Sequence, residues 1–184
     1  MSEHAVTVAL VRTADLPELA DLAARTFPLA CPPGTTCEET DRFVAAHLSL
    51  EAFEGYLADD ARRLLLARSD GAAVGYAMTV AGDPDDPDVA AVVTGPTVEL
   101  SKCYADLAVH GRGVAARLVE AALDLARADT DGQARTCWLG VNQHNVRAQR
   151  FYAKQGFVVV GTKQFDVGGA LHDDFVMVRP LSRL

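Results

Sequence analysis

One stretch of the chain, residues 99–128, restricts the fold more than any other. Leu100 to Ala105 is an extended run, a glycine-bearing loop follows, and Val114 to Ala128 repeats apolar residues at helical spacing. One face of that helix carries Val114, Leu118, Ala122 and Leu125. A strand that passes through a tight loop into a helix with one apolar face predicts a helix packed on a sheet.

The loop at residues 110–115 is suited to bind an anion. Gly111 and Gly113 allow the backbone to turn tightly and to approach a ligand closely. The helix that follows begins with unpaired N–H groups, which carry about half a positive charge and favour phosphate. The loop lacks the Gly-Lys-Ser/Thr of a Walker motif and the third glycine of a dinucleotide fingerprint. A helix start whose glycines serve packing alone is the alternative.

The rest of the chain alternates between strand and helix patterns. A turn is expected at Asp70-Gly71, and residues 163–171, with a glycine pair, are expected to connect the last two strands. Strands are expected at 6–12, 64–67, 73–81, 135–141, 157–160 and 173–178, and helices at 13–26, 37–47, after Ser49 and at 146–155. This order predicts an α/β fold with a mixed sheet covered on both faces. Because no repeat or linker interrupts it, residues 1–184 are expected to form a single domain.

Charge and hydropathy narrow the classes of function. The net charge of −8 disfavours nucleic acid as a partner and is compatible with a cationic substrate. No apolar run is long enough to span a bilayer, and the first residues lack the basic start and apolar core of a signal peptide. We therefore expect a cytoplasmic protein with no membrane partner.

The cysteines and aspartates give no metal site. The four cysteines, Cys31, Cys37, Cys103 and Cys137, form no cluster with zinc spacing. A disulfide between Cys31 and Cys37 stays open, although a reducing cytosol disfavours it. The loop at 82–88 has four aspartates but no EF-hand pattern, so a solvated loop is expected there rather than a calcium site.

Two motifs and the distance between them resemble a known family. The first is the loop His110-Gly-Arg-Gly-Val-Ala, and the second is Trp138-Leu-Gly-Val followed by Asn145-x-x-Ala-x-x-Phe-Tyr-x-x-x-Gly-Phe. Together they look like the GNAT superfamily of acetyl-CoA-dependent N-acetyltransferases, whose loop reads Gln/Arg-x-x-Gly-x-Gly/Ala. Gly113 and Ala115 match that loop and His110 departs from it. The resemblance covers roughly residues 60–180.

Within the superfamily the chain is most similar to bacterial spermine/spermidine acetyltransferases of the PaiA type. The matching pieces are Glu99-Leu100 before Tyr104, the loop form His-Gly-Arg-Gly, and Lys163-x-Phe165-x-x-Gly168 leading to Asp174 and Met177. This resemblance implies a mixed, mostly antiparallel sheet that is splayed in the middle, with helices on both faces. It also implies an acyltransferase that uses acetyl-CoA as co-substrate and no metal.

The resemblance assigns roles to the residues that bind the coenzyme. The pyrophosphate would be held by N–H groups of His110, Gly111, Arg112, Gly113, Val114 and Ala115. The pantetheine arm would pair with the backbone of Cys103, Tyr104 and Ala105, as another strand does. Asn145 would hydrogen-bond the pantetheine, and Tyr152 would be the general acid.

The spacing of Asn145 and Tyr152 agrees with a shared site. They are seven residues apart, about two helical turns, and so face the same side. Each also has a structural alternative: Asn145 as a helix N-cap, which does not exclude binding, and Tyr152 as a core residue beside Phe151 and Phe157. The backbone N–H of Tyr104 is the candidate that stabilises the oxyanion.

Amine acetylation also needs a base. With lysine as a proxy, the amine pKa is about 10.4, so deprotonation costs roughly 4–5 kcal/mol at pH 7. Glu99 is our candidate base, and regular alternation predicts that it shares a strand face with Ser101 and Cys103. A solvated carboxylate at the strand end is the alternative for Glu99, and Asp106 is a weaker candidate base.

The expected function is acetyl transfer from acetyl-CoA to a primary amine of a small molecule, with polyamines as leading candidates, by direct attack in a ternary complex. A protein or peptide N-acetyltransferase and a non-catalytic acetyl-CoA-binding regulatory module are the alternatives. A homodimer stays open. Side chains that would line a polyamine pocket, or simply begin an exposed acidic helix, are Glu38, Glu39 and Asp41, with Phe43 and Tyr56 nearby.

Overall fold

The computed structural model describes residues 6–129 and 133–181, and in them seven strands form one sheet. The spatial order is β1-β2-β3-β4-β5-β7-β6, and every neighbouring pair is antiparallel except the parallel pair β4 and β5. The mixed, mostly antiparallel sheet that the sequence predicts is confirmed. The strands are β1 (Val6–Leu10), β2 (Arg62–Ser69), β3 (Ala72–Ala81), β4 (Thr97–Ala105), β5 (Thr136–Asn142), β6 (Val158–Val167) and β7 (Ala170–Pro180).

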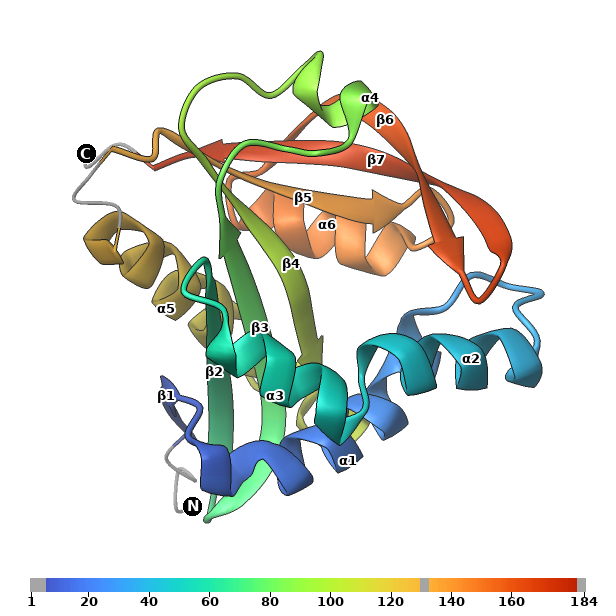
Figure 1. The fold of residues 1–184 in the computed structure, drawn as a ribbon, viewed down its shortest axis with the longest axis vertical. Helices are drawn as coiled ribbons and strands as arrows, with labels where there is room; N and C mark the ends of the chain where they lie inside the picture. Colours follow the sequence, from blue (N-terminus) through green and yellow to red (C-terminus); the bar gives the residue numbers. More distant parts are fainter. Residues whose placement is uncertain (1–5, 130–132, 182–184) are drawn as a thin grey trace.

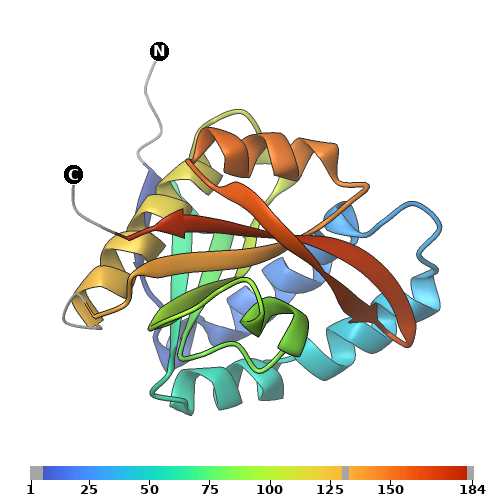
Figure 2. The same ribbon diagram turned by 90° about the horizontal axis from the view of Figure 1, so that it is seen from above.

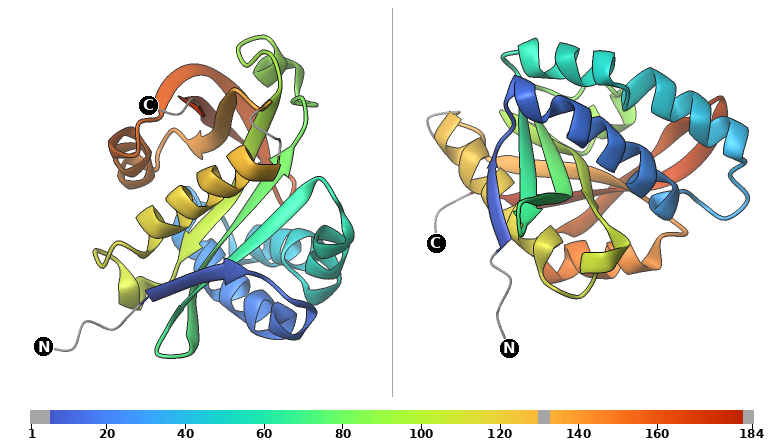
Figure 3. Two further views of the ribbon diagram at one scale, coloured as in Figure 1. Left: turned by 90° about the vertical axis from the view of Figure 1, so that its left-hand side faces the viewer. Right: turned by 90° about the horizontal axis from the view of Figure 1, so that it is seen from below.

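Helices cover both faces of this sheet (Figures 1 and 2). Helix α5 crosses one face of β2, β3 and β4, while α1, α2 and α3 lie on the opposite face (Figure 3). The α-helices are α1 (Leu16–Thr26), α2 (Cys37–His47), α3 (Leu50–Ala58), α4 (Pro87–Ala90), α5 (Val114–Asp129) and α6 (Val146–Lys154). Short 3-10 helices are η1 (Thr13–Asp15), η2 (Phe27–Ala30) and η3 (Leu107–Val109).

Two hydrophobic cores separate these layers. Helix α5 buries the apolar face predicted from its spacing, with Val114, Leu118 and Ala122 almost fully enclosed against the sheet. On the other face, Leu19, Leu22 and Phe53 of α1 and α3 pack on β2 and β3. Fully burying a large apolar side chain stabilises a fold by roughly 1.5–3 kcal/mol, so the two cores fix the position of β4 between them.

The ends of the N-terminal helices follow the cap signals of the sequence. Thr36 caps α2, accepting from the N–H of Glu39 at 3.2 Å, while the Glu39 carboxylate accepts from the N–H of Thr36 at 2.8 Å. Ser49 caps α3 by accepting from the N–H of Ala52. The two caps thus fix the residues at which α2 and α3 begin.

The sheet divides between β4 and β5. These strands pair over only three positions, Thr97 with Thr136, Val98 with Cys137 and Glu99 with Trp138. Beyond Glu99, β4 stays bonded to β3 alone and β5 to β7 alone, and Figure 1 shows the two strands moving apart. The splayed sheet implied by the resemblance is therefore confirmed.

An irregularity in β4 lies where the strands separate. On β3, Thr79 pairs with Leu100 and Met78 with Lys102, so Ser101 is an extra residue with no partner position on that strand. Before this bulge, Leu100 faces α5; after it, Cys103 faces α5 and Tyr104 the opposite core. The prediction that Glu99 shares a face with Ser101 and Cys103 is wrong, because the extra residue shifts the alternation.

Two connections differ from their predicted form. Residues 163–171 are not a loop: β6 and β7 continue through them as a long hairpin that turns only at Gly168-Gly169. The aspartate-rich segment leads into the short helix α4, which Asp86 caps through the N–H of Asp88. Cys31 and Cys37 are both free thiols, so they form no disulfide.

The part of the chain that the structure describes contains no helix long and apolar enough to cross a bilayer. Residues 1–5, on which the signal-peptide expectation depends, lie outside the described residues.

Candidate active site

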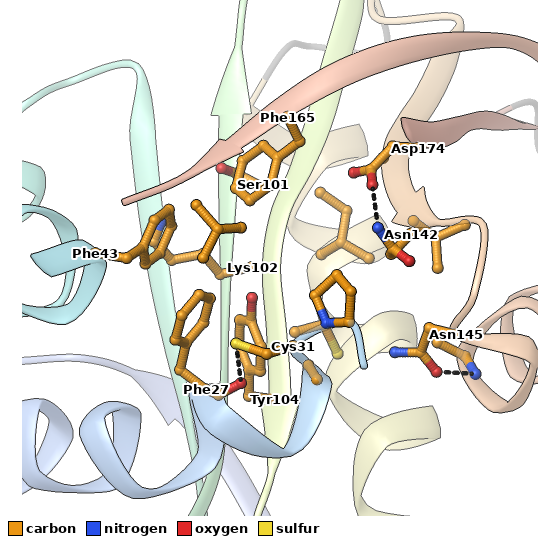
Figure 4. A pocket seen from close by; sticks show the side chains of 18 of the residues that line it. Phe27, Cys31, Phe43, Ser101, Lys102, Tyr104, Asn142, Asn145, Phe165 and Asp174 are labelled. Atoms are coloured by element: carbon orange, nitrogen blue, oxygen red, sulfur yellow. Dashed lines mark hydrogen bonds between the residues drawn. The ribbon is translucent and has the colours of Figure 1, made fainter. Parts of the chain in front are cut away.

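A cavity of about 360 Å³ opens where β4 and β5 separate. Its walls come from β4, β5, α6, β6 and β7 on one side and from η2 and α2 on the other (Figure 4). Five of the residues expected in a site contribute to its lining: Glu99, Cys103, Tyr104, Asn145 and Tyr152. The fold thus brings together side chains from three of the predicted segments.

The glycine loop lies beyond the C-terminal end of β4, next to the open end of the splay. Gly111 and Gly113 have φ angles of 79° and 78°, which only glycine adopts readily. Among the described residues, no acceptor pairs with the N–H groups of Gly111, Gly113, Val114 and Ala115. The loop therefore presents several free donors at the start of α5, which fits a phosphate group.

His110, the departure from the family's loop pattern, has a structural role. Its Nε2 donates to the carbonyl of Ala105 at 3.0 Å, and its Nδ1 accepts from Arg147 of α6 at 3.0 Å. The ring thus fastens the loop to the end of β4 and to α6. Arg117, one turn further on, donates to the carbonyl of Val6.

Asn145 combines both of the roles considered for it. Its Oδ1 accepts from the N–H of Ala148 at 3.0 Å and caps α6, which leaves its NH₂ group to donate elsewhere. The residue also lines the cavity, as Figure 4 shows. The cap therefore fixes the side chain with a donor at the pocket wall.

Tyr152 packs in the core and also reaches the pocket. Its ring makes edge contacts with Phe151 and Phe157, at centroid distances of 5.1 and 5.8 Å. The residue lines the cavity near Cys103, and burial together with that thiol raises the pKa of the phenol well above its ordinary value. The phenol consequently keeps its proton at neutral pH.

Glu99 occupies the closed end of the splay, at the last position where β4 still pairs with β5. It is half-buried, not a solvated strand end, and burial raises the pKa of its carboxyl while Lys163 and Lys102 oppose that shift. Asp106, by contrast, pairs with Arg25 at 2.9 Å, and its hydrogen bond from the N–H of Ala108 lowers its pKa. Asp106 does not line the pocket.

A second carboxylate, Asp174, faces the pocket from β7. Burial raises its pKa to about 6, against the opposing charge of Lys163, and Asn142 Nδ2 donates to it at 3.3 Å. Gly140 leaves room for it, because a Cβ there would lie 3.2 Å from Asp174 Oδ2 and 3.6 Å from Lys163 Cε.

Lys163 lies between the two carboxylates. Its Nζ stands over the ring of Trp138 at 5.5 Å and forms an ion pair with Asp86 at 3.9 Å. Neither Lys163 nor Asp174 was predicted from the sequence to belong to a site. The sequence nevertheless contains a signal for their proximity. If the chain turns at Gly168-Gly169 as a hairpin, counting back along both strands places Lys163 opposite Asp174.

Lys102 is a further pocket residue that the sequence pattern did not predict. The bulge at Ser101 turns it to the same face as Glu99, where its Nζ lies 5.2 Å from the centre of the Tyr56 ring. Burial lowers its pKa to about 8, although Glu99 opposes the shift. Regular alternation would have placed this side chain against α5.

The acidic start of α2 is exposed, as the second alternative for it predicted. Glu38 and Asp41 are exposed and Glu39 is partly exposed, and none of the three lines the pocket. Phe43, from the same helix, does line it, and Tyr56 contacts Lys102 from α3. The apolar residues of these helices thus approach the site while their acids face away.

Comparisons with known proteins agree with this geometry. A model of the acetyltransferase (GNAT) family matches residues 16–157. An uncharacterized N-acetyltransferase of Mycobacterium tuberculosis (strain ATCC 25618 / H37Rv) is 49% identical over 167 residues, which span 91% of this chain and 98% of that protein.

Solved structures share the fold at low identity. The PaiA N-acetyltransferase of Thermoplasma acidophilum, crystallised with coenzyme A, superposes with a TM-score of 0.73 at 17% identity, covering 96% of this chain and 99% of that one. The ribosomal-protein-S18-alanine N-acetyltransferase of Escherichia coli gives a TM-score of 0.67 at 17% identity, covering 98% and 96%.

Proposed function

The chain belongs to the acetyltransferase (GNAT) family, and we propose that it transfers the acetyl group of acetyl-CoA to a primary amine of a small molecule. The observation that carries the proposal is the cavity between the separated strands β4 and β5, which adjoins a loop of free N–H groups. We also propose that residues 1–184 form one domain.

The coenzyme is held mainly by backbone. The free N–H groups of Gly111, Gly113, Val114 and Ala115 bind the pyrophosphate, whereas those of His110 and Arg112, expected to join them, donate to the carbonyls of Leu107 and Val109. The open edge of β4, through the backbone groups of Cys103 and Ala105, pairs with the pantetheine arm as an added strand. The NH₂ group of Asn145 donates to the same arm. Bound acetyl-CoA supplies a thioester that the acceptor amine attacks directly.

Three groups of the chain serve the transfer. Glu99, at the closed end of the splay, accepts the proton of the acceptor ammonium, and its raised pKa makes it a better base than a solvated glutamate. The N–H of Cys103, which points away from β3, faces the carbonyl oxygen as negative charge develops. The N–H of Tyr104, expected for this role, points to β3, because the N–H of Asp106 donates to the carbonyl of Val74 and bonding directions alternate along the strand. The Tyr152 hydroxyl donates its proton to the departing sulfur.

The acceptor is held on the opposite side of the cavity. We propose that Asp174 binds the acceptor ammonium, since it is a buried carboxylate that lines the same cavity as Glu99. The resemblance to the PaiA type makes polyamines the leading acceptors. The fold similarity to a PaiA enzyme supports this choice.

The direct test measures release of free thiol from acetyl-CoA with a panel of amines, polyamines and short peptides. Release with small amines is the expected result. Release with peptides alone would favour the protein N-acetyltransferase, which the likeness to the S18-alanine enzyme makes a real alternative. Tight coenzyme binding without release would indicate a regulatory module and overturn the proposal.

A further inference from the structure

Lys102 presents a positive charge to the pocket and has no ion-pair partner among the described residues, although Glu99, further away, stabilises its charged form. Among the residues that the structure describes, no carboxylate lies within ion-pair distance of its Nζ, and no acceptor receives a hydrogen bond from it. Lys163, the other pocket lysine, is paired with Asp86. A half-buried ammonium without a partner is costly, and such groups are retained mainly where they serve a function.

The surroundings of Lys102 hold the charge in place and do not neutralise it. The ring of Tyr56 is flanked by Lys102 at 5.2 Å and by Arg62 at 5.0 Å, while Arg62 itself is paired with Asp59. The other groups that face Lys102 are Glu99, which stabilises its charged form, and His47, whose own pKa is lowered by burial and by Lys102. The Tyr56 hydroxyl donates to the carbonyl of His47 and so fixes the ring under the lysine.

The pocket is polar at both ends and apolar between them. Figure 4 places Asp174 with Asn142 on one side of the cavity and Lys102 with Phe43 on the other. Between the ends lie aromatic rings: Phe43 stacks on Phe27 at 4.3 Å and contacts Phe165 at 5.7 Å. A molecule that fits this lining has an ammonium, a short hydrocarbon segment and an anion.

We infer that the acceptor carries a carboxylate or similar anionic group in addition to its reacting amine, and that Lys102 binds that group. The inference rests on the proposed transfer to a small primary amine and replaces polyamines as the leading acceptors, because a polyamine would place a second ammonium beside Lys102 and be repelled. An ω-amino acid places its amine at Glu99 and Asp174 and its carboxylate at Lys102.

The test uses acceptors matched in length that differ only at the far end. For chains of three to six carbons, kcat/KM is measured for the ω-amino acid, the alkylamine and the α,ω-diamine. We expect the amino acid to exceed the alkylamine by about tenfold to a hundredfold, as for hydrogen bonds to charged groups, and the diamine to be poorest. A preference for the diamine would overturn the inference while leaving the proposed function intact; thiol release with none of these amines would count against both.

Variants of Lys102 assign the preference to this residue. K102M should abolish the difference between amino acid and alkylamine mainly through KM, K102E should reverse it toward the diamine, and K102R should retain it. K154M, which changes an exposed lysine outside the pocket, is the matched control. Calorimetry with pentanoate as a monoanionic probe gives a readout without turnover: weaker binding to K102M supports the inference, and equal binding to both proteins contradicts it.

Discussion

The two sides of the pocket are built from different kinds of chemical group. At the edge of β4 and in residues 110–115, the pocket offers backbone N–H groups that a change of side chain leaves in place. On the opposite side it offers charged side chains, Glu99, Lys102 and Asp174, that come from two strands. A backbone surface suits a ligand shared by a whole family, whereas a side-chain surface can change with the acceptor.

The largest expected effect is a loss of kcat when the group that protonates the leaving thiolate is removed. Tyr152→Phe removes the hydroxyl proposed to protonate the sulfur while keeping the ring against Phe151 and Phe157. We expect kcat to fall about a hundredfold or more, with little change in the Kd of acetyl-CoA measured by calorimetry. An unchanged kcat would remove Tyr152 from the reaction.

The next effect concerns the base. Glu99→Gln should lower kcat about a hundredfold, because the acceptor amine then loses the group that takes its proton. Asp106→Asn is the matched control, since that carboxylate lies outside the pocket. Steady-state rates at pH 8 separate the two variants, and equal rates for both would refute the assignment.

The charge of Asp174 predicts a pH dependence. Its pKa is raised to about 6, so the carboxylate is charged above that pH and becomes neutral below it. We expect the KM for the acceptor to rise as the pH falls through 6 in the wild-type enzyme. Asp174→Asn should raise KM about tenfold at pH 8 and abolish this further rise. A rise that persists in the variant would mean that another group titrates.

The backbone side can be tested through its torsion angles. Gly113→Val places a branched residue at a φ of 78°, a strain of roughly 1–2 kcal/mol that should displace the N–H groups and raise the Kd of coenzyme A about tenfold. Gly71→Val imposes a similar strain at a φ of 85° in a remote hairpin turn. If both variants weaken coenzyme binding equally, general destabilisation explains the result.

The smallest expected effect is on the KM for the acceptor, and it comes from a glycine of β5 that leaves room for Asp174. Gly140→Ala places a Cβ 3.2 Å from Asp174 Oδ2, so the carboxylate must move by a few tenths of an ångström. We expect about a threefold rise in the KM for the acceptor and no change for acetyl-CoA, a shift of roughly 0.7 kcal/mol. Gly55→Ala, where the added methyl meets nothing within 4 Å, is the control.

The same contrast between backbone and side-chain surfaces explains which parts of the fold and of the site could be predicted from the sequence. The strand, loop and helix around residues 110–115 are local in sequence, so periodicity and glycine spacing predicted them. The predicted order of strands and helices matches the fold except for the short helix α4, which was expected to be loop. Tyr152 and Asn145 follow from a local motif as well. A backbone site of this kind depends on few contacts between residues that are distant in the sequence.

The side-chain wall was harder to predict because it depends on register. Lys102 lies on the pocket face only because Ser101 adds a residue to β4, and nothing in the local pattern marks a bulge there. Asp174 reaches the pocket because β5 and β7 pair and because Gly140 has no side chain. Each of these facts relates residues that are distant in the sequence, which periodicity does not detect.

The extra residue at position 101 has a consequence for how the site could be altered. Removing Ser101 would leave Glu99 and Lys102 on the same face of β4. In the shortened strand only Leu100 would stand between them, and side chains two positions apart point to the same face. The shortened β4 would, however, match β3 without interruption and lose its local twist. A one-residue deletion would therefore keep the acceptor chemistry while straightening the edge that receives the pantetheine, and so separate selectivity from coenzyme capture.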